Sequence, residues 1–279
     1  MFKKEKMTLL SPCDYHVVRE YLRAVDANVL FAYSVVNHDI EGKIFVDDCH
    51  TPTVFYIVHP YGMALLLGNT EQKEFNNVLK NYLSNHLNQR TRPEWLQVYP
   101  RTWEVTLNEL LNKQLCFDNV NQHAISVLER LNFEFSSEKY YLQKETIDLE
   151  GNTLQRTDKS LYEKISGSVI PSRFWNNYSD FERFGVGFSL VDTKGTPLST
   201  AFCSFIYDGQ LELGIETDPR YLGKGYAYVV CSALIDYCLG NKLIPVWACS
   251  SLNSGSQKLA QKLGFSIIRK RPYYQLPNS

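Results

Sequence analysis

Residues 211–265 constrain the fold most, because the period of their apolar residues changes within one short stretch. Apolar residues alternate with other residues from Leu211 to Thr217, a period of two that is typical of a strand with one apolar face. Asp218-Pro219 ends this strand, since proline cannot donate to a sheet. Beyond Gly225 the apolar residues follow helical spacing, at Ala227, Val230, Cys231, Leu234, Ile235, Cys238 and Leu239. The sequence therefore predicts a strand, a glycine-bearing loop and a helix.

The loop between this strand and helix, Arg220-Tyr-Leu-Gly-Lys-Gly225, has the residues that a phosphate site needs. Glycine lets the backbone approach a ligand closely. The start of a helix presents unpaired N–H groups at the positive end of its dipole, and Arg220 and Lys224 add positive charge. A pyrophosphate would fit such a loop. A plain strand-to-helix turn is the alternative that the loop composition leaves open.

The glycine spacing excludes two common nucleotide loops, because the chain has neither G-x-x-x-x-G-K-[ST] nor G-x-G-x-x-G with an acidic residue on a second strand. The loop instead resembles the R/Q-x-x-G-x-G/A acetyl-CoA loop of the GNAT N-acetyltransferase superfamily. A second stretch resembles that family's next helix, through Asn253, Ser256, Leu259, Lys262, Leu263, Gly264 and Phe265. The whole chain, with its divergent front half, is similar to the branch that includes zwittermicin-type antibiotic self-resistance acetyltransferases.

Composition limits the class of protein. With 279 residues, 44% of them hydrophobic, the chain can bury a sizeable core in one or two domains. A net charge of −1 gives no electrostatic basis for binding nucleic acid or an anionic membrane. No apolar run reaches the roughly 18 residues of a membrane span, and MFKKEKMTLL does not read as a signal peptide. Seven cysteines without a C-x-x-C pair predict buried free thiols, no metal and a cytoplasmic location.

The remaining elements follow from periodicity and turn residues. Helices are expected over 8–25, capped by Ser11 or Asp14, over 74–87, 103–111 and 159–165, and through Ala124, Val127, Leu128 and Leu131. Strands are expected over 43–46, 54–58, 63–67, 96–99, 187–191 and 199–206, and 29–36 fits either a helix or a strand. Aromatic residues spaced through 172–184 predict either a wall of the acceptor site or core, at Phe174, Trp175, Tyr178, Phe181 and Phe184.

The two halves of the chain resemble each other. Residues 45–69 and 188–216 both carry a strand ending in Asp, a Thr-Pro, a second strand, an aromatic turn and a third strand. We therefore predict a duplicated α/β unit (α+β in some schemes). The family resemblance implies the GNAT acyl-CoA N-acyltransferase fold, with a mixed, mostly antiparallel twisted sheet flanked by helices. Residues 1–145 would form a divergent GNAT-like half without the CoA loop, and 146–279 the acetyltransferase domain. Chance similarity between short amphipathic strands is the alternative.

The resemblance implies where acetyl-CoA, the co-substrate, would bind. In the family the fourth and fifth strands part and the pantetheine arm lies between them, which here involves the backbone of Ile215, Glu216 and Thr217. The pyrophosphate would meet the loop and helix start, at Arg220, Tyr221, Leu222, Gly223, Lys224, Gly225 and Tyr226. Asn253, which can also cap the last helix, and Ser256 would complete the site. Gly214 would leave one side of the strand bare for the ligand or mark a β-bulge.

The catalytic residues are less determined. Glu212 and Glu216 lie on one strand face, and Glu212 falls where many GNAT enzymes place a catalytic or water-binding glutamate. A solvated strand face is the alternative. All six histidines, from His16 to His123, lie in the front half. The family's usual proton-donating tyrosine is replaced by Ala260, and nothing ranks Tyr226, Tyr228, Tyr273 and Tyr274 as substitutes.

These features predict an acetyl-CoA-dependent N-acetyltransferase that acts by direct attack in a ternary complex. Its acceptor would be a small-molecule amine, and an antibiotic is implied only by the resemblance. Two alternatives stay open, which are an acyl-CoA-binding sensor or interaction module and a peptide or protein N-acetyltransferase. The front half would shape the substrate cleft or an oligomer interface, which is compatible with a homodimer.

Overall fold

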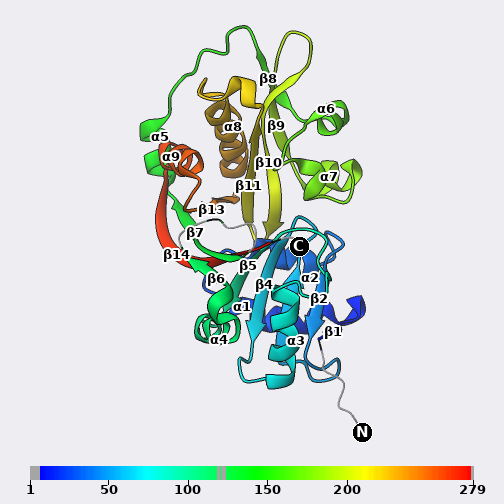
Figure 1. Cartoon of the computed structure of the whole chain (residues 1–279). Coiled ribbons are helices and arrows are strands. Elements are labelled where there is room, and N and C mark those ends of the chain that lie inside the picture. Colours follow the sequence, from blue (N-terminus) through cyan, green and yellow to red (C-terminus); the bar gives the residue numbers. More distant parts are fainter. Residues whose placement is uncertain (1–6, 118–119, 121–123, 278–279) are drawn as a thin grey trace. The chain divides into compact units, whose positions relative to one another are not determined.

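The structure is a computed structural model that describes residues 7–117, 120 and 124–277. Residues 1–6, on which the signal-peptide prediction partly depends, and His123 lie outside the described residues. The chain divides into two compact units, one of residues 1–130, 250–252 and 270–279 and the other of 131–249 and 253–269. Each unit contains its own series of hydrogen-bonded strands (Figure 1).

The first unit contains an antiparallel run of strands followed by one parallel pair. Its strands are β1 (Thr8–Leu9), β2 (Lys43–Val46), β3 (Val54–Val58), β4 (Met63–Gly68) and β5 (Glu94–Tyr99). β4 and β5 pair in parallel, and the end of β14 (Phe265–Leu276) pairs with β5 through Tyr274–Leu276. The helical elements are η1 (Pro12–Val18), α1 (Arg19–Arg23), α2 (Leu30–Val36), α3 (Lys73–Leu83), α4 (Thr102–Leu111) and η2 (Asn112–Gln114).

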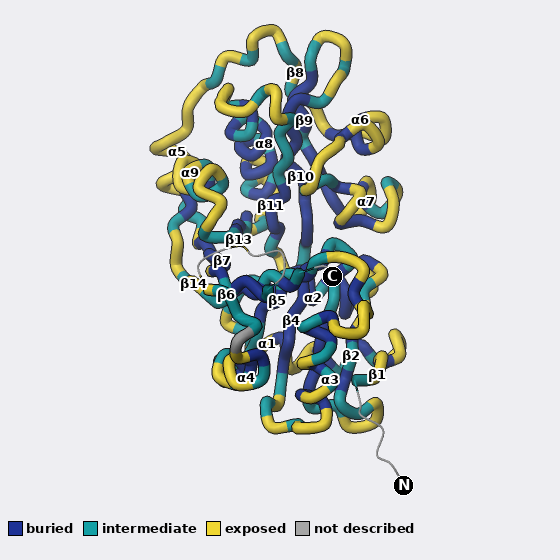
Figure 2. The backbone as a smooth tube through the Cα atoms, in the orientation of Figure 1, coloured by how far each residue is buried: buried dark blue, intermediate teal, exposed yellow. Residues whose placement is uncertain are grey.

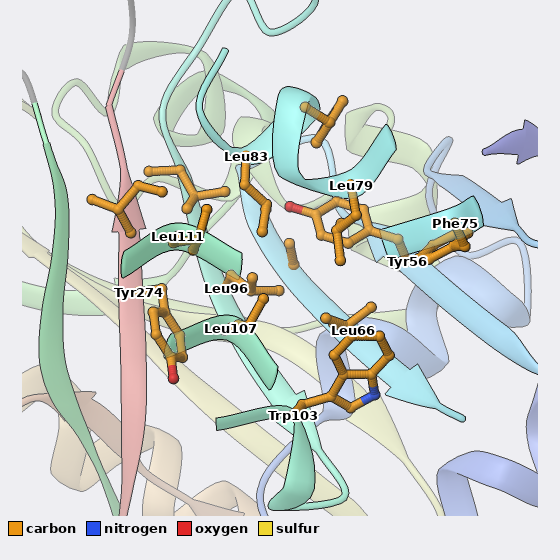
Figure 3. Close-up of a cluster of buried hydrophobic side chains, with 14 of the residues drawn as sticks. Tyr56, Leu66, Phe75, Leu79, Leu83, Leu96, Trp103, Leu107, Leu111 and Tyr274 are labelled. Atoms are coloured by element: carbon orange, nitrogen blue, oxygen red, sulfur yellow. The ribbon is translucent and has the colours of Figure 1, made fainter. Parts of the chain in front are cut away.

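The core of the first unit lies between α3, α4 and one face of the sheet. Leu79 of α3 and Trp103 and Leu107 of α4 are fully buried against Tyr56 and Leu66 of the strands (Figure 3). The opposite face meets α1 and α2, where the Tyr21 and Phe55 rings lie 4.7 Å apart. Both faces of β3 and β4 are therefore buried along nearly their whole length (Figure 2).

The second unit has a five-stranded sheet in the order β12-β11-β10-β9-β8. Its strands are β8 (Thr153–Arg156), β9 (Gly187–Val191), β10 (Pro197–Tyr207), β11 (Gln210–Thr217) and β12 (Ile244–Val246). All neighbours are antiparallel except β11 and β12, which are parallel. Helix α8 (Tyr226–Gly240) packs on β9, β10 and β11, and η3 (Pro171–Arg173) packs on β10.

Eight further helices and strands occur in the described residues. They are β6 (Leu115–Phe117), β7 (Ile125–Phe135), α5 (Ser137–Gln143), α6 (Lys159–Lys164), α7 (Tyr178–Phe184), η4 (Pro219–Tyr221), β13 (Ala248–Ser250) and α9 (Ser254–Lys262). Strands β7, β13 and β14 each contribute residues to both units.

The order of elements confirms the predicted fold class and its repetition. An antiparallel run of three strands, a helix and a parallel strand occur first as β2-β3-β4-α3-β5 and again as β9-β10-β11-α8-β12. The turn that follows the first strand of each run is also alike. Asp47 Oδ1 accepts the Thr53 and Val54 N–H groups, and Asp192 Oδ1 accepts those of two turn residues, Lys194 and Thr196.

The helix predicted over 8–25 was right only for residues 12–23, and the helix predicted through 124–131 was wrong. Residues 8–25 form β1, η1 and α1, because Thr8 and Leu9 pair with β2, and the Ser11 side chain caps nothing. Residues 125–135 form strand β7, although their apolar spacing fits a helix, because pairing with distant strands overrides a local period. The ambiguous stretch at 29–36 contains helix α2, and α3 ends at Leu83.

Most aromatic side chains of the segment 172–184 and most of the cysteines are buried. Phe174, Trp175 and Phe181 are buried in the second unit, whereas Phe184 is 54% exposed, so most of the aromatic segment is core. All seven cysteines are free; four are buried, whereas Cys13 and Cys49 are exposed and Cys116 is half-buried.

Within the described ranges there is no cluster of three metal-ligating side chains, and no helix combines the length and apolar character that crossing a membrane requires.

Candidate functional site

Strands β11 and β12 part halfway along β11. They pair only from Gln210, opposite Ile244, to Glu212, opposite Val246. Beyond that point the chain continues into β13, which pairs with β7, and the Phe133 N–H donates to the Trp247 carbonyl at 3.1 Å. In the part of the chain that the structure describes, residues 213–217 of β11 therefore have a strand partner on the β10 side only. Their other backbone edge is open to a ligand with amide groups.

The open edge leads into the glycine loop. Gly223 and Gly225 both have φ of +80°, a left-handed conformation that residues with a Cβ rarely adopt. Gly225 is the N-cap of α8 and has no side chain with which to satisfy the first N–H groups of this 15-residue helix. The helix start thus presents its donors and the positive end of its dipole at the end of the open strand.

Both cations of the loop are paired with carboxylates. The Arg220 guanidinium donates to Asp218 through Nε at 3.0 Å and Nη2 at 2.6 Å, and these bonds lower the pKa of Asp218 to about 2. Lys224 Nζ lies 2.7 Å from Glu150 Oε2. An incoming phosphate would therefore compete with two carboxylates for these side chains.

Residues 145–152 run along the loop and the first turn of α8, a placement that sequence reasoning missed. Glu150 Oε2 accepts the Tyr226 hydroxyl at 2.7 Å, and Asn152 Nδ2 donates to the same hydroxyl at 3.1 Å. A Cβ on Gly225 would come within 3.3 Å of the Ile147 side chain. We call residues 145–152 the strap. Its polar, turn-rich sequence reads as a linker, and no local signal indicates this contact.

The other predicted coenzyme-binding residues occupy two places. Tyr221 stacks on Tyr226 with ring centroids 6.2 Å apart, and Leu222 is 65% exposed in the loop. Asn253 accepts the Ser256 N–H at 3.0 Å, which confirms its role as the cap of α9. Ser256 Oγ in turn accepts the Trp247 indole N–H at 3.0 Å. Among the described residues no hydrogen bond joins Asn253 or Ser256 to the loop.

The strand face that carries Glu212 and Glu216 differs from expectation at Gly214. A Cβ at Gly214 would meet the Phe202 ring at 2.5 Å and also the Ser204 hydroxyl, so this side of the strand is filled by protein. The prediction of a bare side is therefore wrong. The bulge is in the partner strand, because Cys203 pairs with Leu213 and Phe205 with Glu212, which leaves Ser204 as the extra residue of β10.

The two candidate glutamates have different surroundings. Glu212 is only 5% exposed, opposite Phe205. Glu216 is half-buried, and its Oε2 accepts N–H groups from Ser168 at 2.9 Å and Val169 at 2.6 Å. Glu216 also lines a cavity of about 280 Å³. The structure thus brings Glu216, but not the loop glycines, into contact with the segment that follows α6.

The structure does not single out any of the four candidate tyrosines as the missing acid. Ala260 is fully buried. The Tyr228 hydroxyl accepts the Glu145 N–H at 2.8 Å, and the Tyr226 hydroxyl is engaged by the strap. Tyr273 and Tyr274 belong to the first unit, as do all five described histidines. One of these, His59, is fully buried, and burial lowers its pKa to about 3.

At the equivalent place, the first unit has neither a parted strand pair nor a glycine loop. Its β4 and β5 stay paired from Met63, opposite Trp95, to Leu67, opposite Tyr99, so the strands do not part. Residues 69–72 alone connect β4 to α3, whereas 218–225 connect β11 to α8. The shorter connection contains no glycine.

Comparison with known proteins gives the family. A family profile described as GNAT acetyltransferase matches residues 22–274. The chain is 27% identical over 247 residues to an uncharacterised N-acetyltransferase, YdfB, of Bacillus subtilis (strain 168), and the match covers 88% of this chain and 89% of that one.

Solved structures agree in fold. A GCN5-related N-acetyltransferase-like protein from Streptococcus suis superposes with a TM-score of 0.69 at 18% identity, over 95% of this chain and 99% of that one. A tandem GNAT protein from the clavulanic acid biosynthesis pathway superposes with a TM-score of 0.62 at 8% identity, over 98% of each chain. Since the family profile spans nearly the whole sequence, the chain belongs to the GNAT acetyltransferase family and is a GNAT-type N-acetyltransferase.

Proposed function

We propose that the protein transfers an acetyl group from acetyl-CoA to the amine of a small molecule, by direct attack in a ternary complex. The observation that carries this proposal is the parting of β11 and β12 at Glu212, which opens a backbone edge that leads into the glycine loop. The open edge of β11 comes directly before the glycine loop in the sequence. An extended ligand that ends in phosphates would therefore lie along the edge and reach the loop.

The residues present fit the coenzyme. The backbone groups of Ile215, Glu216 and Thr217 would pair with the amides of the pantetheine arm, because they lie on the open edge of β11. Residues 220–226 would hold the pyrophosphate through backbone donors, Arg220 and Lys224. Bound acetyl-CoA supplies an activated thioester, and the chain supplies position, hydrogen-bond donors and a proton acceptor.

For the proton, we propose Glu212, acting directly or through a water. Its buried position in β11 lies at the point where the two strands part, four residues before Glu216. A backbone N–H near Glu216 would face the thioester oxygen. The departing thiolate needs no dedicated acid, because a CoA thiol with a pKa near that of cysteine, about 8.5, can take a proton from solvent.

A second candidate is an acyl-CoA-binding sensor or interaction module, and buried Ala260 at the usual tyrosine position favours it. Thiol release from acetyl-CoA in the presence of an amine library separates the two. We expect release that depends on both the protein and an amine. A chain that binds acetyl-CoA but releases thiol with none of the amines would contradict the transferase and support the sensor.

The front half would keep the architecture without binding CoA, which the pairing of β4 with β5 supports. Free cysteines throughout the described chain support a reducing, cytoplasmic compartment.

A further inference from the structure

We infer that Glu216 is a positioning residue, which clamps the segment 166–169 onto β11 and so fixes one wall of the amine-acceptor cavity. This inference rests on the proposed function for the identity of the acceptor cavity. The clamp itself is defined by the contacts of Glu216 and stands independently of the coenzyme.

The carboxylate of Glu216 is used as a hydrogen-bond acceptor for a surface segment. Its Oε2 accepts the backbone N–H of Ser168 at 2.9 Å and that of Val169 at 2.6 Å, with the Ser168 hydroxyl at 3.4 Å. Two successive N–H groups on one oxygen hold the segment in a single orientation, because each bond to a charged acceptor is stronger than one between neutral groups. A carboxylate that already accepts these bonds is a poor choice for taking a proton from substrate.

The segment is shaped to receive this carboxylate. Gly167 has φ of +140°, and a Cβ there would lie 2.7 Å from Glu216 Cγ and Oε2. Only glycine allows this approach. Ser166, Gly167 and Ser168 are exposed, so they have little burial of their own, whereas Ile165 and Pro171 on either side are buried. The Glu216 bonds therefore decide where the exposed part of the segment lies.

The cavity of about 280 Å³ lies between this segment and the sheet. Ser166 of the clamped segment lines it, beside Lys164 and Ile165 at the end of α6. Ser199, Thr200 and Glu216 line it from β10 and β11, and Asp218 and Arg220 line the end where the cavity meets the glycine loop. Its volume is close to the lower end, about 300 Å³, of sites that hold small molecules. Because Glu216 contacts both sides, the clamp sets the width of the cavity.

The lining points to a class of acceptor. The residues that line the cavity include Ser166, Thr196, Lys164 and Lys194, together with the ion pair of Asp218 and Arg220. Asp192 lies close enough to Lys194 to be affected by its charge, so the lysine charge is partly balanced. A polar amine with hydroxyl or carboxylate groups matches this lining better than an aliphatic amine, and the clamp would select for its size.

Two substitutions of one residue separate clamping from proton transfer. Glu216→Gln keeps an oxygen that can accept the two N–H groups but is no base, whereas Glu216→Ala removes the acceptor. We expect Gln to raise the KM for a polar amine by no more than about threefold, and Ala to raise it by roughly tenfold or more with kcat changed far less. Neither should alter the pH dependence of kcat. A collapse of kcat in both variants with a changed pH profile would make Glu216 the base and overturn the proposal.

A second pair of variants tests the clamp with Glu216 intact. Gly167→Ala pushes a Cβ into the carboxylate and should reproduce the KM effect of Glu216→Ala. Gly209→Ala is the matched control, because Gly209 also has positive φ, of +73°, in the β10–β11 turn, and nothing lies within 4 Å of its added Cβ. Its KM for the amine should stay at the wild-type value.

Amide hydrogen exchange tests the clamp even if no amine is acetylated. Exchange at Ser168 and Val169 should accelerate in Glu216→Ala and Gly167→Ala and stay near wild type in Glu216→Gln and Gly209→Ala. Unchanged exchange in Glu216→Ala, with a normal thermal unfolding midpoint, would show that the carboxylate does not hold the segment. Accelerated exchange in a chain without transferase activity would instead refute only the proposed function.

Discussion

Glu150 and Lys224 form an ion pair of 2.7 Å at the end of the glycine loop. Glu150 has φ of +52°, which is uncommon for a residue with a side chain, in a turn where Asp148 Oδ1 accepts its N–H at 2.9 Å. The strap thereby presents a carboxylate beside the N-terminus of α8, where a coenzyme phosphate would also be attracted. The protein's own anion and the ligand's anion would compete for Lys224.

Glu150→Gln should therefore tighten acetyl-CoA binding. Lys224 and Glu150 are 42% and 53% exposed, and solvent screens a pair this exposed, so we expect a gain of no more than about fivefold. Calorimetric titration measures it. Glu163→Gln is the control, because Glu163 forms an exposed pair with Lys159 within α6 and is not a residue of the loop or the strap. Weaker binding in Glu150→Gln would mean that Glu150 orders the site instead of competing for it.

The glycine loop should not tolerate side chains. Gly225→Ala adds a Cβ to a residue at φ of +80° and 3.3 Å from Ile147, and Gly223→Ala adds one at the same φ. Each should lower the free energy of unfolding by about 1–2 kcal/mol. We expect acetyl-CoA affinity to fall at least tenfold in Gly225→Ala.

Gly209→Ala again serves as the control for strain alone, since it has a similar φ in a turn outside the loop. It should lose stability but keep its acetyl-CoA affinity. Equal affinities of Gly225→Ala and Gly209→Ala for acetyl-CoA would show that the loop does not bind the coenzyme.

Glu212→Gln should lower kcat by about 10²–10⁴ if Glu212 takes the amine proton. The limb of the pH profile of kcat that reports deprotonation of the base should disappear, while acetyl-CoA affinity stays the same. Steady-state kinetics across pH measure both. A variant with wild-type turnover and an unchanged profile would place the base elsewhere.

Glu94 in the first unit should make stability depend on pH. Its two carboxylate oxygens accept the hydroxyls of Tyr56 at 2.6 Å and Tyr82 at 2.7 Å, and burial raises its pKa. A pKa that is higher in the folded state gives a contribution that is full below the unfolded value of about 4.3 and is lost as pH rises toward the folded value.

Glu94→Gln removes this titration. The free energy of unfolding of wild type relative to the variant should therefore fall as pH rises above about 4, which denaturant titrations of both proteins at several pH values would measure. A difference that does not vary with pH would show that Glu94 keeps an ordinary pKa.

Periodicity was enough where an element's residues pack against neighbours close in sequence. The alternation from Leu211 to Thr217 and the helical spacing after Gly225 predicted β11 and α8, since these two elements pack on each other. Asn253 was predicted as a cap because capping depends only on residues three positions apart. The parting of β11 and β12 came from family resemblance and not from any period.

Features that depend on contacts between residues far apart in the sequence were not predicted. β7 reads as a helix because its partners β6, β13 and β14 are separate stretches of the chain whose pairing no local window contains. The space beside Gly214 is filled by Phe202 and Ser204, which depends on a bulge in the partner strand. The contact of Glu150 with Lys224 joins residues 74 positions apart. Such contacts exist only once the sheet has formed.

Calorimetric titration of the whole chain with acetyl-CoA tests the central claim most directly. The parted strands and glycine loop of the second unit, together with the fully paired β4 and β5 of the first, predict one bound acetyl-CoA per chain, with binding lost or much weakened in Gly225→Ala. No heat of binding, or two equivalents per chain, would contradict it.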